Sequence, residues 1–272
     1  MSAEPSQDPV ILREQDMEQP LVHPFVGGQA VLFSRRSPDK EGPNQDCAAL
    51  LPHDKQSGVL MIADGAGGMR GGNQASAIAV HELAAALEAA AQQRTSLREA
   101  ILDGIEAANR EISVLGIGAA TTVIVAELRG NVLRPYHVGD SGILAFGQKG
   151  KLKVQTMFHS PTGYAVEAGL LNERDALRHD ERHLVSNVIG NPEMRIEMGS
   201  AVELAPKDTV LLATDGLFDN LRTDEIVELL RKGPLDEAIA ELARAVRKRM
   251  ETADERRPGK PDDLTLVGFR LD

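Results

Sequence analysis

Two periodicities alternate along this chain of 272 residues, and together they predict strands and helices that come in groups. Short apolar runs bounded by turns are typical of strands, whereas apolar positions three or four residues apart are typical of helices. The strand pattern occurs at 29–34, from 46 onward, and at 58–63, 119–128, 132–138, 143–146, 195–204, 209–213 and 264–271. The helical pattern occurs in two pairs, at 75–90 with 97–112 and at 226–230 with 235–250.

The order of these segments favours antiparallel sheets over a parallel one. The turn Arg129-Gly130-Asn131 separates two strand patterns and predicts a hairpin, and the helices come in pairs instead of following each strand. We therefore expect an α+β fold in which antiparallel sheets carry helices on their outer faces.

Two segments show little of either periodicity. Residues 1–24 are rich in proline, glutamine and acidic residues, so we expect a tail that is disordered or lies on the surface of a folded domain at 25–272. Residues 156–191 are irregular apart from one short helix near 173–177. A long irregular segment inside a compact domain is often functional.

Composition narrows the classes of protein that the chain can represent. Its hydrophobic fraction of 42% is enough for a sizeable core. Forty-one acidic against 30 basic residues give a net charge of −11, which argues against a general nucleic-acid or membrane-surface binder. The single cysteine, Cys47, excludes an intrachain disulfide, and we expect a buried residue there instead of a nucleophile. With neither a signal-peptide pattern nor an apolar stretch of about 20 residues, we expect a cytoplasmic protein.

Five aspartates stand where an apolar run meets a turn. They are Asp46, Asp64, Asp140, Asp215 and Asp262. Strand ends of this kind gather carboxylates at one end of a sheet, where they repel each other unless a cation lies among them. Mg2+ and Mn2+ prefer oxygen ligands, so the pattern predicts a metal enzyme.

The segments around these aspartates, and the order in which they occur, resemble the motifs of the metal-dependent protein phosphatase family, also called protein phosphatase 2C. The matching segments are Asn-Gln-Asp at 44–46, Asp-Gly-Ala-Gly-Gly at 64–68, Gly-Ala-Ala-Thr-Thr at 118–122, Val-Gly-Asp-Ser-Gly at 138–142, Thr-Asp-Gly-Leu-Phe-Asp at 214–219 and Asp-Asp-Leu-Thr at 262–265. The resemblance implies a four-layer αββα sandwich, two antiparallel β-sheets flanked by helix pairs. It also implies that 25–272 is a catalytic domain with a flap at about 156–191.

The resemblance further implies two Mn2+ or Mg2+ ions, and a third that binds more weakly. Asp64 would bridge the first two ions, and the Gly65 carbonyl would complete the ligands of one. Asp46 would contact that same ion directly or through water. Asp215 and Asp262 would bind the other ion, and Asp140 and Asp219 would bind the third. The catalytic set is then Asp46, Asp64, Asp215 and Asp262, with a metal-bridging hydroxide as the nucleophile.

Competing explanations exist for several of these residues. Asp before Gly is a routine turn pair, which is the alternative role of Asp64. The alternative for Asp140 is to cap a turn through its side chain, and the alternative for Asp219 is to start the following turn. We expect Asp263 to be solvated. The flap histidines are candidate acids or ligands, against the more ordinary role of polar surface; they are His159, His179 and His183.

The chain also departs from the family pattern. Gln45 stands where many members have Glu, and Ala66 where many eukaryotic members have a His that acts as general acid. Glu41 stands where a phosphate-binding Arg is often found. The candidates to bind phosphate in place of that Arg are Lys40, Arg35 and Arg36. The default alternative for each is a solvated charge on the surface.

The resulting hypothesis is a monomeric serine/threonine phosphoprotein phosphatase, linked to a serine/threonine kinase, that binds neither nucleic acid nor membrane. A catalytically silent scaffold or sensor that binds a phosphoprotein is the first alternative. The second is a partner-switching phosphatase that acts on an anti-sigma antagonist.

Overall fold

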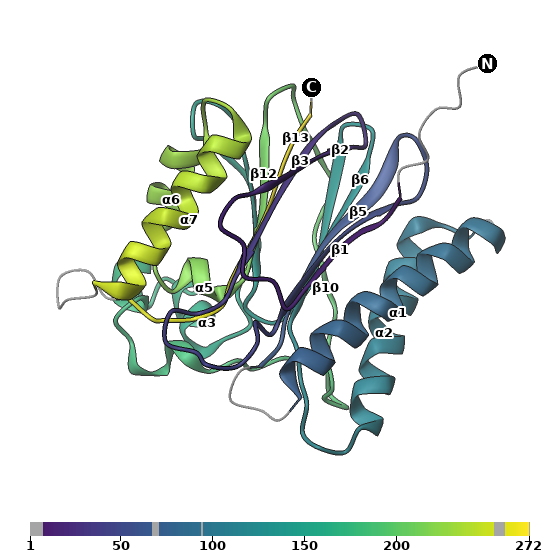
Figure 1. Cartoon of the computed structure of the whole chain (residues 1–272), viewed down its shortest axis with the longest axis horizontal. Helices are drawn as coiled ribbons and strands as arrows, with labels where there is room; N and C mark the ends of the chain where they lie inside the picture. The colour runs from purple at the N-terminus through teal and green to yellow at the C-terminus, as the bar shows by residue number, and fades with distance from the viewer. Residues whose placement is uncertain (1–7, 67–70, 94, 253–258, 272) are drawn as a thin grey trace.

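The computed structural model describes residues 8–66, 71–93, 95–252 and 259–271, which form two sheets between two helix pairs (Figure 1). The first sheet runs in the order β1 (Val10–Arg13), β4 (Asp46–Pro52), β5 (Ser57–Asp64), β6 (Val123–Arg129), β7 (Val132–Val138) and β10 (Glu197–Met198), with β11 (Val202–Glu203) also paired to β7. The second runs in the order β2 (Leu21–Phe25), β3 (Gly28–Arg35), β13 (Leu264–Leu271), β12 (Thr209–Ala213), β8 (Gly142–Phe146) and β9 (Leu152–Gln155). All pairings are antiparallel, which confirms the predicted sheet type, and β6 and β7 form the predicted hairpin.

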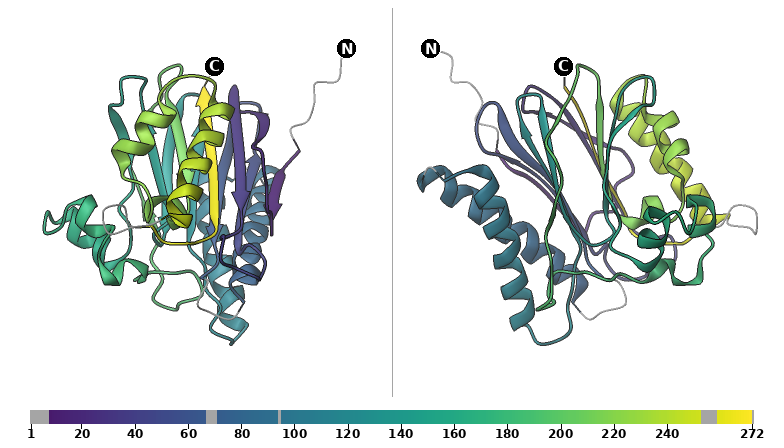
Figure 2. Two further views of the ribbon diagram at one scale, coloured as in Figure 1. Left: turned by 60° about the vertical axis from the view of Figure 1, so that its left-hand side comes forward. Right: turned by 180° about the vertical axis from the view of Figure 1, so that it is seen from behind.

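Each sheet has a helix pair on its outer face, as the views in Figures 1 and 2 show. Helices α1 (Gly72–Gln93) and α2 (Leu97–Val114) pack against the first sheet, and α6 (Thr223–Leu230) and α7 (Leu235–Glu251) lie over the second. Ser96 caps the N-terminus of α2: its hydroxyl accepts a hydrogen bond from the Glu99 N–H, and the Glu99 carboxylate accepts one from the Ser96 N–H. The short helices are α3 (Pro161–Glu167), α4 (Glu173–Ala176), the 3-10 helix η1 (Asp180–His183) and α5 (Asp215–Phe218).

The core consists of three apolar layers, and strand periodicity distributes side chains between them. On β5, Leu60 and Ile62 point between the two sheets, whereas Val59 and Met61 point toward α1 and α2. Because both faces of this strand are covered, its sequence is a continuous apolar run and does not alternate. The four-layer αββα prediction is confirmed.

The expectation of an irregular N-terminal tail at 1–24 is wrong for residues 10–13 and 21–24. These residues belong to β1 and β2, which pair with β4 and β3 at the edges of the two sheets. Their apolar side chains are partly in water, as with Ile11 at 44% and Val22 at 41% exposure. The partner of β1, β4, lies far along the chain, whereas β2 forms a hairpin with the adjacent β3 through the turn at 26–27. Strands as short and half exposed as these show weak periodicity. The remainder of the predicted tail, 1–7, lies outside the described residues.

Smaller differences concern short elements. Strand β9 and helices α3 and α5 were not predicted, and residues 119–122 precede β6 instead of belonging to it. Cys47 is buried as predicted, and burial raises the pKa of its thiol to about 11. No helix in the described ranges is long and apolar enough to cross a membrane.

Candidate active site

One end of the sandwich collects carboxylates from four parts of the chain. Asp46 begins β4 and Asp64 ends β5, and the two face each other in the antiparallel register. Asp215 begins α5 just after β12, and Asp262 lies two residues before β13. Since β12 and β13 are neighbours, these two residues also come from adjacent strand ends.

Asp140 and Asp219 join the same group. Asp140 lies in the turn by which the chain crosses from β7 in one sheet to β8 in the other, and Asp219 follows α5. Gly139 has φ +110°, and a Cβ there would lie 2.5 Å from the Thr122 Cβ, so the turn requires glycine. Burial, followed by the charges of Asp215 and Asp219, raises the pKa of Asp140 well above its ordinary value.

Burial and mutual repulsion raise the pKa of the other carboxyls as well. For Asp64 burial is the largest cause, and the charges of Asp46 and Asp215 follow. Burial, followed by the charge of Asp215, raises the pKa of Asp262 to about 6 and that of Asp219 to about 7. The sequence therefore gathers carboxylates that resist ionising together unless a cation compensates them.

Asp46 carries the clearest sign of a missing partner. It is 1% exposed, and neither carboxylate oxygen has a hydrogen-bond partner among the described residues. Burial and then the charge of Asp263 raise its pKa well above the ordinary value, and a weak interaction with the Thr265 hydroxyl opposes the rise without satisfying either oxygen. Buried carboxylates are normally paired, hydrogen-bonded or bound to metal.

Lys260 compensates the other carboxylates from within the chain. Its Nζ lies 2.6 Å from Asp215 Oδ2, 2.8 Å from Asp219 Oδ2 and 3.1 Å from Asp262 Oδ2. Burial opposes the charge of Lys260, but the three carboxylates outweigh it and raise the pKa of the ammonium. Sequence reasoning missed this role; the available signal was a lysine two positions before Asp262 in a basic segment.

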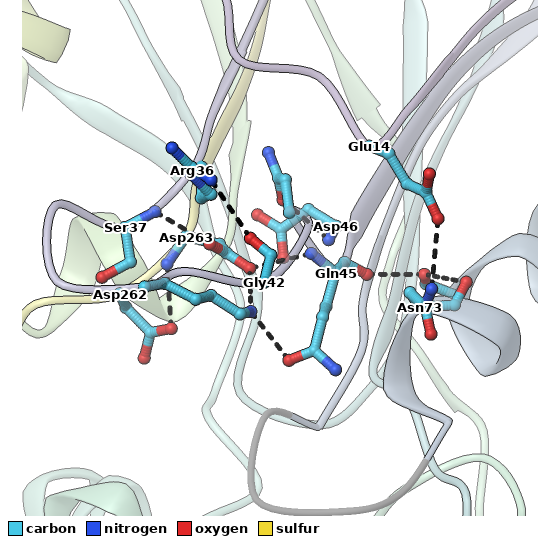
Figure 3. Close-up of polar contacts among 12 residues, drawn as sticks. Glu14, Arg36, Ser37, Gly42, Gln45, Asp46, Asn73, Asp262 and Asp263 are labelled. Atoms are coloured by element: carbon cyan, nitrogen blue, oxygen red, sulfur yellow. Dashed lines mark hydrogen bonds and ion pairs between the residues drawn. The ribbon is translucent and has the colours of Figure 1, made fainter.

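Asp263 is buried, contrary to the expectation that it is solvated, and it fastens the segment before β4 (Figure 3). Its carboxylate accepts from the backbone N–H of Ser37 and of Gln45, each at 2.8 Å. The Lys40 ammonium donates to Asp263 Oδ2 at 2.6 Å and to Gln45 Oε1 at 2.8 Å. Gln45 and Asp263 thus hold Lys40 beside the acidic centre.

Arg35 and Arg36, the other two candidate phosphate ligands, lie toward the N-terminal segment. Arg35 Nε is 3.8 Å from Asp16, and Arg36 Nη2 is 3.7 Å from the same carboxylate. Arg36 Nη1 also donates to the Gly42 carbonyl at 3.4 Å. Of the three candidates, Lys40 contacts the residues that adjoin the acidic centre.

The flap histidines are engaged elsewhere. His159 Nδ1 accepts from the Gly139 N–H at 3.1 Å, so its other nitrogen carries the proton and faces Glu197 at 3.1 Å. His159 therefore positions the turn that bears Asp140. His179 Nδ1 accepts from the Glu181 N–H at the start of η1, and His183 is exposed.

His137, His159 and Glu197 are also close enough together to suggest a metal site. One ligand atom from each lies within 4.8 Å of the others. However, the two imidazole rings stack at 4.4 Å and 23°, so their in-plane lone pairs run nearly parallel instead of converging on one ion. Burial, followed by the charge of His159, lowers the pKa of His137 to about 4.

Backbone and flap shape the space around the carboxylates. A Cβ on Gly65 would lie 2.3 Å from the Gly72 carbonyl oxygen, so only glycine lets the backbone pass here. Gly67 and Gly68 of the same motif lie outside the described residues. A cavity of about 350 Å3 opens on Asp140, Asp215 and Asp219 and is walled by the flap segment and α5.

An αββα sandwich with a carboxylate centre at one end defines a class of metal-dependent hydrolase, and comparison with known proteins agrees. A family model described as protein phosphatase 2C matches residues 36–257. A Streptococcus pyogenes serotype M6 protein named as a protein phosphatase of the 2C type is 30% identical over 211 residues, covering 75% of this chain and 85% of the relative. The Listeria monocytogenes serine/threonine phosphatase stp is 28% identical over 200 residues, 69% of this chain and 77% of the relative.

Solved structures give the same result. The serine/threonine phosphatase of S. agalactiae superposes with a TM-score of 0.75 at 25% identity, covering 90% of this chain and all of that one. The chain belongs to the protein phosphatase 2C family.

Proposed function

We propose that this chain hydrolyses phosphoserine and phosphothreonine esters in proteins, using divalent metal ions held by its aspartates. The observation that carries the proposal is Asp46, a buried carboxylate with two unsatisfied oxygens, opposite Asp64 in the same cluster. A hard cation is the group that would satisfy such oxygens. The close passage of the Gly65 backbone fits the same group, since a side chain there would collide.

The metal roles proposed for the individual residues are those that the family resemblance implies, and the arrangement of the carboxylates supports them. Asp46, Asp64 and the Gly65 carbonyl would hold one Mn2+ or Mg2+, with Asp64 shared by a second ion. Asp215 and Asp262 would hold that second ion, and Asp140 and Asp219 a third, weaker one. When bound, such ions supply a hydroxide at neutral pH and neutralise charge on the phosphoryl group.

The chain's own residues would do the rest. Lys40 would bind a phosphoryl oxygen, because Gln45 and Asp263 fix its ammonium beside the carboxylates. Ala66 supplies no proton, so water would protonate the leaving alcohol. Phe158 and Phe218, whose rings lie 4.9 Å apart, line the cavity at the carboxylates and would exclude water from that side.

We extend the proposal to the setting of the enzyme: a cytoplasmic monomer, linked to a serine/threonine kinase, with a substrate-selecting flap at 156–191. The catalytic domain would extend N-terminally beyond residue 25, because β1 and β2 belong to the two sheets. Neither the scaffold nor the partner-switching alternative has an observation in its favour.

The test is hydrolysis of para-nitrophenyl phosphate and of a phosphothreonine peptide with Mn2+, with Mg2+ and with EDTA. We expect metal-dependent turnover of both substrates. Asp64→Asn should lower kcat/KM on the order of 1,000-fold, because the shared metal ligand loses its charge. Asp103→Asn, at an exposed position of α2, is the matched control and should behave like the wild type. Absence of turnover, together with calorimetry that detects no Mn2+ binding, would falsify the enzyme proposal.

A further inference from the structure

Beside Asp262 lies a second cavity, of about 330 Å3, and its lining is unusually basic for a protein with a net charge of −11. It lies where α7 meets the end of β3. Its four arginines, which we call the arginine cluster, are Arg35, Arg36, Arg244 and Arg247.

Most of the hydrogen-bonding capacity of the arginine cluster is unused. A guanidinium has five N–H donors. Arg35 Nε is buried without a hydrogen-bond partner, and its ion pair with Asp16 spans 3.8 Å. Arg244 is exposed and has no hydrogen bond or ion pair within the part of the chain that the structure describes.

The other two arginines hold the cluster in place. Arg247 Nε donates to Glu251 at 2.5 Å, and its Nη1 donates to the Arg36 carbonyl at 3.3 Å. The contacts of Arg35 and Arg36 with Asp16 are surface pairs, because the Asp16 side chain is 51% exposed, and such pairs contribute little stability. Folding alone therefore gives little reason for four guanidinium groups at one cavity, whereas binding of an anion does.

The position of the cavity indicates where that anion comes from. Asp262 lines the cavity and also contacts Lys260 at the acidic centre, so the two sites share a wall. An extended peptide advances about 3.3–3.6 Å per residue. A substrate with its phosphoryl group at the carboxylates would therefore reach the cavity within about three residues.

We propose that the arginine cluster binds an acidic group of the substrate, a carboxylate or a second phosphate, within about three residues of the phosphoresidue. Arginine suits both groups, because its planar fork matches their paired oxygens. The inference rests on the proposed phosphatase function and gives it a substrate class, acidic phosphopeptides.

The experiment compares phosphothreonine peptides that carry glutamate, lysine or phosphoserine at each position from three before to three after the phosphothreonine. For the wild type we expect kcat/KM for a glutamate peptide to exceed that for its lysine counterpart about tenfold at one or more positions, mainly through KM. The preference should shrink at high salt. A larger gain with phosphoserine would identify a second phosphate as the better ligand.

Arg244→Glu is the decisive variant, because the side chain is exposed and its replacement breaks no hydrogen bond or ion pair among the described residues. We expect the ratio of glutamate-peptide to lysine-peptide kcat/KM to fall to one or below. Lys248→Glu is the matched control: it makes the same charge change one turn further along α7, outside this cavity, and should leave the ratio unchanged. Equal ratios in the two variants would overturn the proposal, since general surface charge would then explain the preference.

Para-nitrophenyl phosphate separates this proposal from the one on which it rests, because it has no flanking residues. If the wild type hydrolyses it with Mn2+ but shows no preference among the peptides, only the arginine-cluster proposal is wrong. If it hydrolyses neither para-nitrophenyl phosphate nor any peptide, the phosphatase function is wrong and the arginine-cluster proposal falls with it.

Discussion

The two sides of the acidic centre differ in how their negative charge is compensated. On the side formed by β4 and β5, Asp46 is buried opposite the half-buried Asp64, and Asp46 has no hydrogen-bond partner among the described residues. On the side formed by α5 and the segment before β13, the Lys260 ammonium lies among three carboxylates. The first side therefore depends on a cation from solution, whereas the second side has a cation of its own.

This difference has a consequence for metal binding. An ion that enters between Asp46 and Asp64 meets two carboxylates that form no ion pair with any lysine or arginine in the described ranges. An ion that binds Asp215 and Asp262 must displace the Lys260 ammonium, so part of its binding free energy is offset. We therefore expect the two sides to bind Mn2+ with different affinities, the β4–β5 side more tightly.

Replacing Lys260 should have the largest effect on this comparison. In EDTA, Lys260→Met should lose about 3 kcal/mol of unfolding free energy in urea denaturation, because three partly buried carboxylates lose their shared partner. Calorimetry should show tighter binding of Mn2+ by the variant, and Mn2+ should restore its stability. Lys232→Met, at an exposed position, is the control. Unchanged stability and unchanged Mn2+ affinity would show that Lys260 does not compete with the ion.

The same substitution at two buried aspartates should have opposite effects in EDTA. Asp46→Asn should raise the free energy of unfolding, since it removes an acidic group whose ionisation burial opposes and which has no hydrogen-bond partner among the described residues. Asp263→Asn should lower it by about 2 kcal/mol, because the new amide group faces the N–H donors of Ser37 or Gln45 or the Lys40 ammonium. Urea denaturation measures both. A change of the same sign in both variants would contradict the distinction between an unsatisfied and a satisfied carboxylate.

A pH scan sharpens the comparison once the contribution of His137 is subtracted. The raised pKa values of Asp219 and Asp262 make the metal-free protein less stable as pH rises toward about 7. His137 acts in the opposite direction: its folded pKa of about 4 lies below the ordinary value of about 6.5, so its contribution is lost as pH falls between them. By pH 5 this loss is about 2 kcal/mol. His137→Gln should remove it, as seen in the difference between the two unfolding curves from pH 7.5 to pH 5. A difference that does not vary with pH would assign the acid sensitivity to other groups.

The fold illustrates how far sequence patterns can be followed. Short continuous apolar runs predicted the central strands, and helical spacing of apolar residues predicted the two helix pairs, because both patterns record local burial. Strands β1 and β2 were missed because each is short and half exposed, which leaves little periodicity to follow; only β1 has a partner distant in sequence. Pairing at the edge of a sheet, not the preference of the residues themselves, makes these segments strands.

The candidate site divides in a similar way. The aspartates could be identified from sequence, since each follows an apolar run or belongs to a recognisable motif. Asp263 and Lys260 could not, because a charged residue in a polar segment is solvated by default. Their roles depend on which carboxylates and N–H groups the fold brings within hydrogen-bonding distance.

The sequence by itself determined the layered α+β architecture and the convergence of carboxylates, because both follow from strand periodicity and from residues placed at strand ends. Only the tertiary structure decided which charges are compensated from within the chain. Lys260 enters the acidic centre, Lys40 is held beside it, and Arg35 and Arg36 lie at a separate cavity. The physical reason is that electrostatic interactions depend on distance and burial, and neither can be read from the order of residues along the chain.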